Sequence, residues 1–204
     1  LDGDPVLLSD NWDSTNPRDF VSASTRQQTV VFQTSFNGNR IQKKYTFYPD
    51  SYNIDVEVAF NKPNDYISRN QYYLSWFGGL SPTEKNVKDD LTHFGGYAYL
   101  GDELLSSSGK NENEVVATQK GQTHWSAVTT KYFISAIIPE TPGVGASVGA
   151  KQIDGRPIYN VKINQSASSS NRFTLYVGPL DYKTIRSFDL SLIHISEPTR
   201  PLYI

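Results

Sequence analysis

The carboxylate pair Asp55 and Glu57 is the first place in this sequence where acid–base chemistry is conceivable. Both lie in the run from Tyr52 to Phe60, so in a strand their side chains point the same way, about 7 Å apart. An inverting glycosidase needs its two carboxyl groups ~6.5–9.5 Å apart. The outer face of a sandwich strand is polar in any case, and we favour that ordinary interpretation. The pairs Asp89-Asp90 and Asp102-Glu103 are interpreted as loop charges by the same reasoning.

The histidines are the next candidates, as metal ligands. His93 and His124 have no Glu or Cys at metal-ligand spacing around them, so we expect ordinary hydrogen bonds from both. His194 lies in the C-terminal segment treated below. Because the chain has no cysteine, disulfides, zinc ribbons and thiol catalysis are excluded.

The remaining motifs are weaker. The glycine-rich run Gly143 to Gly149 has its third glycine one position too late for a dinucleotide loop, and we interpret residues 140–149 as a flexible loop. No Gly-x-Ser-x-Gly elbow occurs, and Asn164-Gln165-Ser166 is only a three-residue glycosylation match. A group of aromatic residues could stack on sugars or hold a peptide, but such residues more often form core: Tyr72, Tyr73, Trp76 and Phe77. We therefore expect no catalytic residue, no cofactor-binding residue and no metal ligand.

The elements that position these residues show a period of two, which is the period of a half-buried strand. Apolar residues alternate with polar ones along residues 52–60, with Asp55 and Glu57 on the polar side. Residues 41–48 alternate in the same way, and Pro49-Asp50-Ser51 is ordinary turn chemistry. The pattern predicts an antiparallel hairpin over residues 40–61, with one set of side chains facing the core: Tyr52, Ile54, Val56, Val58 and Phe60.

Similar runs follow along the whole chain. Strands are predicted over residues 29–36 (before the turn Asn37-Gly38-Asn39), 71–77, 93–100, 115–119, 125–138, 158–163 and 172–177. Loops are predicted over residues 79–90, 140–149 and 166–171, and the only predicted helix covers residues 181–188. Many short strands with frequent turn signals indicate an all-β sandwich.

Composition limits the function further. The chain has 204 residues, enough for one large domain, and a net charge of −2. This charge gives no general attraction to nucleic acid. The longest uncharged apolar stretch runs from Tyr132 to Pro139, well short of the ~18–20 residues of a membrane helix. The sequence begins at Leu1 without a leader pattern, so we expect a piece of a longer protein.

Two motifs in the last third resemble a known family. The first is Trp125-Ser126-Ala127-Val128 followed by the run from Lys131 to Pro139, and the second is the run from Leu175 to Pro179 followed by residues 181–185. Both resemble the large periplasmic domain of bacterial YidC-type membrane protein insertases. Residues 41–60 are similar to a hairpin of that domain, and residues 95–98 to its central part. Thr130-Lys131 stands where the commonest family pattern has Gln-Gln.

This resemblance implies a β-supersandwich of two packed antiparallel sheets over residues 1–189, with a short C-terminal helix. In the family, one membrane helix precedes the domain and a bundle of membrane helices, which carries the insertion activity, follows it. The implied location is the periplasmic side of the bacterial inner membrane. The implied partners are nascent inner-membrane proteins and the Sec translocon, and the domain itself is a scaffold and interaction module rather than an enzyme.

Residues 190–204 show no strand alternation and do not fit the sequence that precedes them. The run from Leu190 to Arg200 resembles translated adapter DNA from a sequencing library, so we interpret residues 190–204 as not native. Two other classes stay open for residues 1–189 because fold alone does not define function. They are a carbohydrate-binding or carbohydrate-processing sandwich and a non-catalytic adhesion or secreted sandwich.

Overall fold

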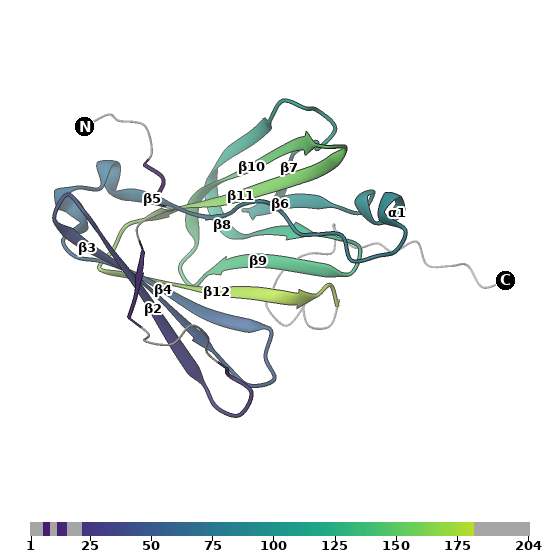
Figure 1. The fold of residues 1–204 in the computed structure, drawn as a ribbon. Helices are drawn as coiled ribbons and strands as arrows, with labels where there is room; N and C mark the ends of the chain where they lie inside the picture. Colours follow the sequence, from purple (N-terminus) through teal and green to yellow (C-terminus); the bar gives the residue numbers. More distant parts are fainter. Residues whose placement is uncertain (1–5, 9–11, 16–21, 182–204) are drawn as a thin grey trace.

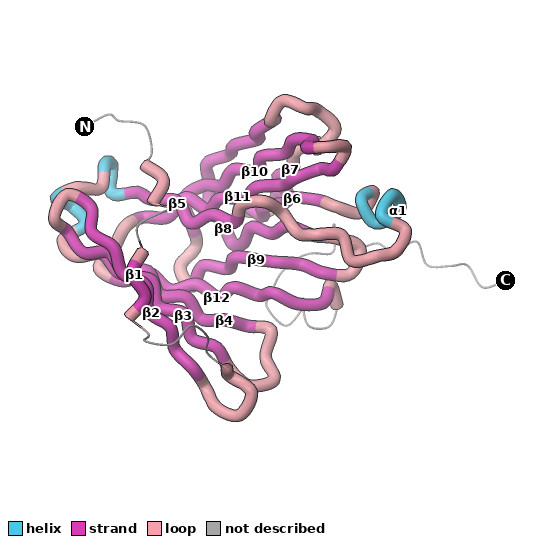
Figure 2. Tube along the Cα trace, viewed as in Figure 1, coloured by secondary structure: helices cyan, strands magenta, loops and turns pink. Residues whose placement is uncertain are grey.

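The computed structural model describes residues 6–8, 12–15 and 22–181. The strands are β1 (Asp13–Ser14), β2 (Gln28–Phe36), β3 (Asn39–Phe47), β4 (Asn53–Phe60), β5 (Gln71–Trp76), β6 (Gly95–Leu100), β7 (Glu103–Ser106), β8 (Val115–Thr129), β9 (Phe133–Pro139), β10 (Gly143–Ile153), β11 (Arg156–Ser166) and β12 (Ser170–Pro179). One α-helix, α1 (Val87–Leu91), and two 3-10 helices, η1 (Pro63–Asp65) and η2 (Ser68–Asn70), complete the described part. Strands dominate throughout (Figure 2), which confirms the all-β prediction.

Local turn chemistry builds the first half of the sheet. Asn37 and Gly38 adopt positive φ values of 49° and 77°, as a two-residue hairpin turn requires, and they join β2 to β3. The next hairpin joins β3 to β4. In β4, Val56 and Phe60 are buried, whereas Asp55 is exposed. The predicted hairpin and its register are therefore confirmed from Ile54 to Phe60, whereas Tyr52, predicted to face the core, precedes β4 and is 56% exposed.

All the strands belong to one antiparallel sheet. Its order is β1-β2-β3-β4-β12-β9-β8-β10-β11-β5, with β6 paired to β8 and β7. The two separate sheets predicted from the sandwich pattern are not found among the described residues. The reason is the 15-residue strand β8. Its first part pairs with β10 and its second part with β6 and β9, so hydrogen bonding continues from one half to the other.

The single sheet nevertheless folds back over itself (Figure 1). The strands β4 and β5 are far apart in the hydrogen-bonding order. The ring centroid of Phe60 on β4 nevertheless lies 4.7 Å from that of Tyr72 on β5. Buried Ile163 of β11 packs in the same cluster as Val56 and Val58 of β4. A sandwich-like core is thus enclosed by two parts of one sheet.

The strand β10 corrects the prediction of a loop over residues 140–149. It runs between β8 and β11, where neighbouring atoms leave no room for larger side chains. A Cβ atom on Gly143 would lie 2.7 Å from Cγ2 of Ile163 and 2.8 Å from the carbonyl oxygen of Asn164. These small residues therefore serve close packing rather than flexibility.

Other boundaries also differ from the predictions. The strand β8 continues through Gly121 instead of ending there, with a φ of 153° that glycine adopts and other residues rarely do. The apolar run 125–138 is divided between β8 and β9 by a turn in which the N–H of Phe133 donates to Oγ1 of Thr130 over 3.1 Å. The helix α1 lies in a stretch predicted as loop, and β1 and β7 were not predicted. The helix predicted over residues 181–188 and the segment 190–204 lie outside the described residues, apart from Asp181.

A second apolar cluster surrounds Trp125, which is 1% exposed. Its indole stacks on the ring of Tyr99 with centroids 5.9 Å apart, and Ile134 and Tyr176 pack in the same cluster. These residues come from β6, β8, β9 and β12. The motif that begins at Trp125 therefore contributes to a core that joins four strands in the middle of the sheet. Within the described ranges, no helix has the length and apolar character needed to cross a membrane.

Candidate functional site

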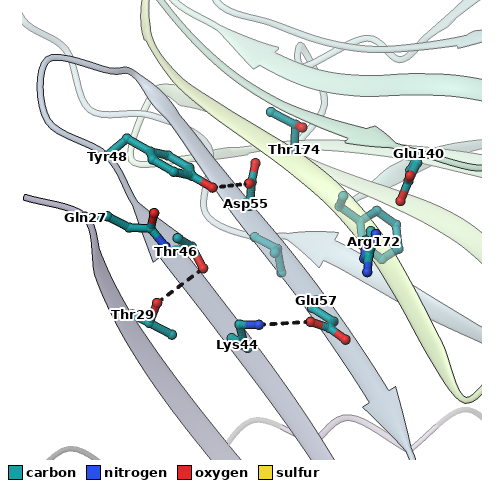
Figure 3. A pocket seen from close by; sticks show the side chains of 12 residues that line it. Gln27, Thr29, Lys44, Thr46, Tyr48, Asp55, Glu57, Glu140, Arg172 and Thr174 are labelled. Atoms are coloured by element: carbon teal, nitrogen blue, oxygen red, sulfur yellow. Dashed lines mark hydrogen bonds and ion pairs between the residues drawn. The ribbon is translucent and has the colours of Figure 1, made fainter.

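A hollow of about 630 Å³ lies on the outward face of β2, β3, β4 and β12 (Figure 3). Most of its side chains are polar because successive residues of a strand point to opposite faces, and the apolar ones point to the core. The hollow is lined by Gln27, Thr29, Lys44, Thr46, Tyr48, Asp55, Val56, Glu57, Glu140, Arg172, Phe173 and Thr174.

The sheet register arranges these side chains in rows across the strands. Lys44 of β3 is opposite Glu57 of β4, which in turn is opposite Arg172 of β12. The N–H of Glu140 donates to the carbonyl oxygen of Arg172 over 3.0 Å, which places a second carboxylate next to this row. The row therefore alternates between positive and negative charge, which stabilises cross-strand pairing.

Glu57 is the most strongly engaged carboxylate of the hollow. It accepts hydrogen bonds from Oγ of Ser170 at 2.7 Å and from Nζ of Lys44 at 3.3 Å. These bonds, together with the positive charges of Lys44 and Arg172, hold the pKa of Glu57 below its ordinary value. A general acid in a glycosidase needs a raised pKa. Glu57 is thus suited to hydrogen bonding as a carboxylate and not to proton donation.

Asp55 stands in the adjacent row, opposite Thr46 and Thr174. Its Oδ2 accepts a hydrogen bond from the hydroxyl of Tyr48 at 2.5 Å, and this bond raises the pKa of the Tyr48 hydroxyl. The two carboxylates proposed from spacing do line one hollow, but each is bound to its own partner. The arrangement is a hydrogen-bonding surface with fixed charges.

The histidines are placed elsewhere. His124 lies on the part of β8 that pairs with β6, and its ring centroid is 5.8 Å from that of Tyr99. The N–H of His93 donates to the carbonyl oxygen of Asp90 just after α1. Among the described residues, no group of three or more His, Cys, Asp or Glu side chains could hold a metal ion.

The other acidic pairs have distinct roles. Asp90 is fully buried, which corrects its interpretation as a loop charge. Its Oδ2 accepts the N–H of Thr83 at 2.9 Å and that of Glu84 at 3.3 Å, so it closes the loop before α1. Asp89 pairs with Nζ of Lys131 at 2.7 Å, and Glu103 accepts from the side-chain amide of Gln119.

The aromatic group divides between core and surface. Tyr72 and Trp76 pack in the core, and burial raises the pKa of the Tyr72 hydroxyl. Tyr73 and Phe77 are each 50% exposed on or beside β5. The side-chain amide of Asn164 donates to Gln71 over 3.0 Å.

Sequence reasoning did not identify the partners of the two carboxylates. Tyr48, Lys44 and Arg172 all stand on polar sides of alternating runs, which is the signal that could have marked them. Alternation shows which side chains share a face of one strand. It does not show which strand lies alongside, and β12 is more than a hundred residues from β4 in sequence.

The family model and similar known proteins indicate the same family. A family described as YidC periplasmic domain matches residues 2–195. The chain is 35% identical over 179 residues to the "Membrane protein insertase YidC" of Chlorobaculum parvum, covering 83% of this chain and 30% of that protein. It is 34% identical over 160 residues to the protein of the same name from Chlorobium limicola, covering 75% and 27%. It is 36% identical over 155 residues to the protein of the same name from Chlorobium luteolum, covering 72% of this chain and 26% of that protein.

The chain thus spans less than a third of the length of these relatives. The family match includes the strands that line the hollow and also the strands that surround Trp125. This family is not one of enzymes. The chain belongs to the YidC family of membrane protein insertases, as a periplasmic domain of such a protein.

Proposed function

We propose that this domain acts as a non-catalytic scaffold and interaction module within an insertase that helps inner-membrane proteins to insert and fold. The observation that carries the proposal is the family match over residues 2–195. Because the chain spans less than a third of its relatives, we assign insertion itself to membrane-embedded parts outside this sequence. The domain then lies on the periplasmic side of the bacterial inner membrane.

The proposed partners are nascent inner-membrane proteins and the Sec translocon. The hollow supports a polar contact with such a partner, because its row of Lys44, Glu57 and Arg172 presents alternating charges. Polar and charged surfaces of this kind give orientation and specificity in association. We do not assign an enzymatic step to the domain.

The proposed domain organisation is a supersandwich over residues 1–189 that ends in a short helix, with residues 190–204 not native. Support comes from the sheet that folds over itself, bringing Phe60 against Tyr72. The later part of the motif at residues 125–139 forms β9, and residues 175–179 of the second motif lie in β12, its hydrogen-bonded neighbour.

Site-directed cross-linking tests the interaction role. The chain contains no cysteine, so a single introduced thiol reports one position. Thr174→Cys places a cross-linker in the hollow, and Val116→Cys, 54% exposed on β8, is the control. We expect cross-links from Thr174→Cys, but not from Val116→Cys, to the Sec translocon or to a stalled nascent membrane protein in proteoliposomes. Equal cross-linking from both positions contradicts a role for the hollow.

Carbohydrate binding remains a second candidate because Asp55, Glu57 and Arg172 line one hollow. Carboxylates and guanidinium groups can hydrogen-bond to sugar hydroxyls. Calorimetric titration with soluble peptidoglycan fragments tests this candidate, with Arg172→Gln as the comparison. Saturable binding that Arg172→Gln weakens favours carbohydrate binding, and the absence of heat at millimolar sugar contradicts it.

A further inference from the structure

Exposed apolar side chains gather at the end of the sheet where β12 finishes. We define the exit patch as four residues that are 56%, 46%, 41% and 36% exposed, respectively: Tyr52, Tyr132, Phe133 and Val177. They come from three separate stretches of sequence, before β4, around the β8–β9 turn and within β12. Large apolar side chains from separate segments that stay exposed at one end of a sheet mark an interaction surface.

Backbone contacts place the four residues at the same end of the sheet, with Tyr52 over Gly178 on one face of β12 and Val177 on the other face. The N–H of Val177 donates to the carbonyl oxygen of Tyr52 over 3.0 Å, and the N–H of Leu180 donates to that of Tyr132 over 2.7 Å. Phe133 is the register partner of Pro179. The patch therefore surrounds residues 177–180, the last part of the described chain, at the right-hand end of β9 and β12 in Figure 1.

Basic side chains border this patch. Nζ of Lys131 lies 5.4 Å from the ring centroid of Tyr132 and 2.7 Å from Oδ2 of Asp89. The pair with Asp89 holds α1 beside the β8–β9 turn. That helix presents Val87, which is 42% exposed, and exposed Lys88. Apolar and aromatic groups are thus combined with exposed Lys88 and with the ion pair of Lys131 and Asp89 on one end of the domain.

This combination is typical of a surface that meets the boundary between water and lipid. Tyrosine rings are enriched at the level of the lipid headgroups, and lysines near the surface are attracted by anionic lipids. On the proposed function, which this inference requires, the domain belongs to a protein whose other parts are embedded in the membrane, so one end of the domain faces the bilayer.

We propose that the exit patch rests on the headgroup region of the membrane, with Tyr132 and Phe133 inserted and with Lys88 toward anionic lipids. This contact fixes which end of the domain faces the bilayer. It leaves the hollow, on β2, β3, β4 and β12, available to a partner. A second copy of this chain or a partner protein on the same patch is the alternative that the experiment must separate.

Vesicle flotation tests the contact with a matched pair of double variants. Tyr132→Ser with Phe133→Ser removes two aromatic rings from the patch. Tyr73→Ser with Phe77→Ser removes the same two ring types from β5, where both are 50% exposed. With vesicles of phosphatidylethanolamine and phosphatidylglycerol, we expect the 204-residue chain and the β5 variant to float equally. The patch variant should bind at least about fivefold less, because buried apolar groups set interfacial affinity.

Equal flotation of both double variants, or no flotation of the unchanged chain, overturns the proposal. Sedimentation without vesicles gives the oligomeric state, and self-association lost only in the patch variant assigns the patch to a second copy instead. Circular dichroism shows whether each variant folds. These outcomes do not depend on cross-linking from Thr174→Cys, so failure of this inference and failure of the proposed function are distinguishable.

A second measurement leaves the aromatic residues in place. Because the chain has no cysteine, Val87→Cys and Val116→Cys can each carry one environment-sensitive fluorophore. Both valines are exposed, at 42% and 54%. Vesicles should shift the emission to the blue at position 87 and leave position 116 unchanged. A shift of the same size at both positions contradicts the proposed orientation.

Discussion

Ser170 and Glu57 are 113 residues apart in sequence, yet Oγ of Ser170 donates a hydrogen bond of 2.7 Å to the carboxylate of Glu57. The bond connects β12 to β4 beside the hollow: Ser170 is the register partner of Ala59, whereas Glu57 is in the row of Lys44 and Arg172. It is the first cause of the lowered pKa of Glu57. One hydroxyl therefore helps to decide that this carboxylate is an acceptor rather than an acid.

Ser170→Ala should raise the pKa of Glu57 toward its ordinary value. Because the folded-state pKa is lowered, Glu57 contributes stability that is present above its unfolded pKa, and this contribution disappears as pH falls through the folded value. In Ser170→Ala, the loss of unfolding free energy between neutral and acidic pH should be smaller. NMR titration of the side-chain carboxyl measures the pKa, with Thr174→Ala in the same hollow as control. An unchanged Glu57 pKa contradicts the assignment.

Trp125→Ala should destabilise the domain by ~3–5 kcal/mol, the usual cost of deleting a large core side chain. Trp125 is 1% exposed and stacks on Tyr99. Chemical denaturation followed by circular dichroism measures the change in the free energy of unfolding. Val116→Ala on the same strand, 54% exposed, should stay within ~0.5 kcal/mol. Similar effects of the two substitutions would remove Trp125 from the core.

Gly143→Ala should destabilise the domain by ~1–3 kcal/mol through overpacking. The added Cβ would lie 2.7 Å from Cγ2 of Ile163 and 2.8 Å from a backbone oxygen, and the backbone cannot move aside without disturbing β11. Ser147→Ala, on the same strand and half-buried, should cost less than ~1 kcal/mol. Thermal unfolding compares the two. A neutral Gly143→Ala would restore the interpretation of this segment as a flexible loop.

Deletion of residues 190–204 should leave the free energy of unfolding within ~0.5 kcal/mol of that of the full chain. If these residues derive from adapter DNA, no selection has matched Leu192, Ile193 or Ile195 to the sandwich. Denaturant titration of both lengths measures the difference. A loss of several kcal/mol would show that the segment packs on the domain, and the adapter interpretation would be wrong.

Several features could be predicted from local residues alone. Asn37-Gly38 indicated the β2–β3 turn because positive φ is a property of the turn residues themselves. Alternation over residues 52–60 predicted which side chains of β4 face the core, because the period of two depends only on strand geometry. Within this set Tyr52 was the exception: it precedes β4 and is 56% exposed, as part of the exit patch.

The sequence-based predictions failed where the conformation or burial of a residue depends on segments that are distant in sequence. Glycine and alanine between residues 143 and 150 look like a loop in isolation, but they form β10 because β8 and β11 approach closely there. Asp90 looks like a surface charge, but it is buried, and its Oδ2 accepts hydrogen bonds from the N–H groups of Thr83 and Glu84. In both cases the deciding atoms come from other segments.

The sequence by itself determined the all-β class, the first hairpins and, through the motifs at residues 125–139 and 175–179, the family. These properties depend on local conformation and on the order of residues. Only the tertiary structure decided that one sheet folds over itself, that Ser170 holds Glu57, and that Tyr52, Tyr132, Phe133 and Val177 meet at one end. The physical reason is that strand pairing joins residues far apart in sequence, and alternation within one strand carries no information about its neighbour.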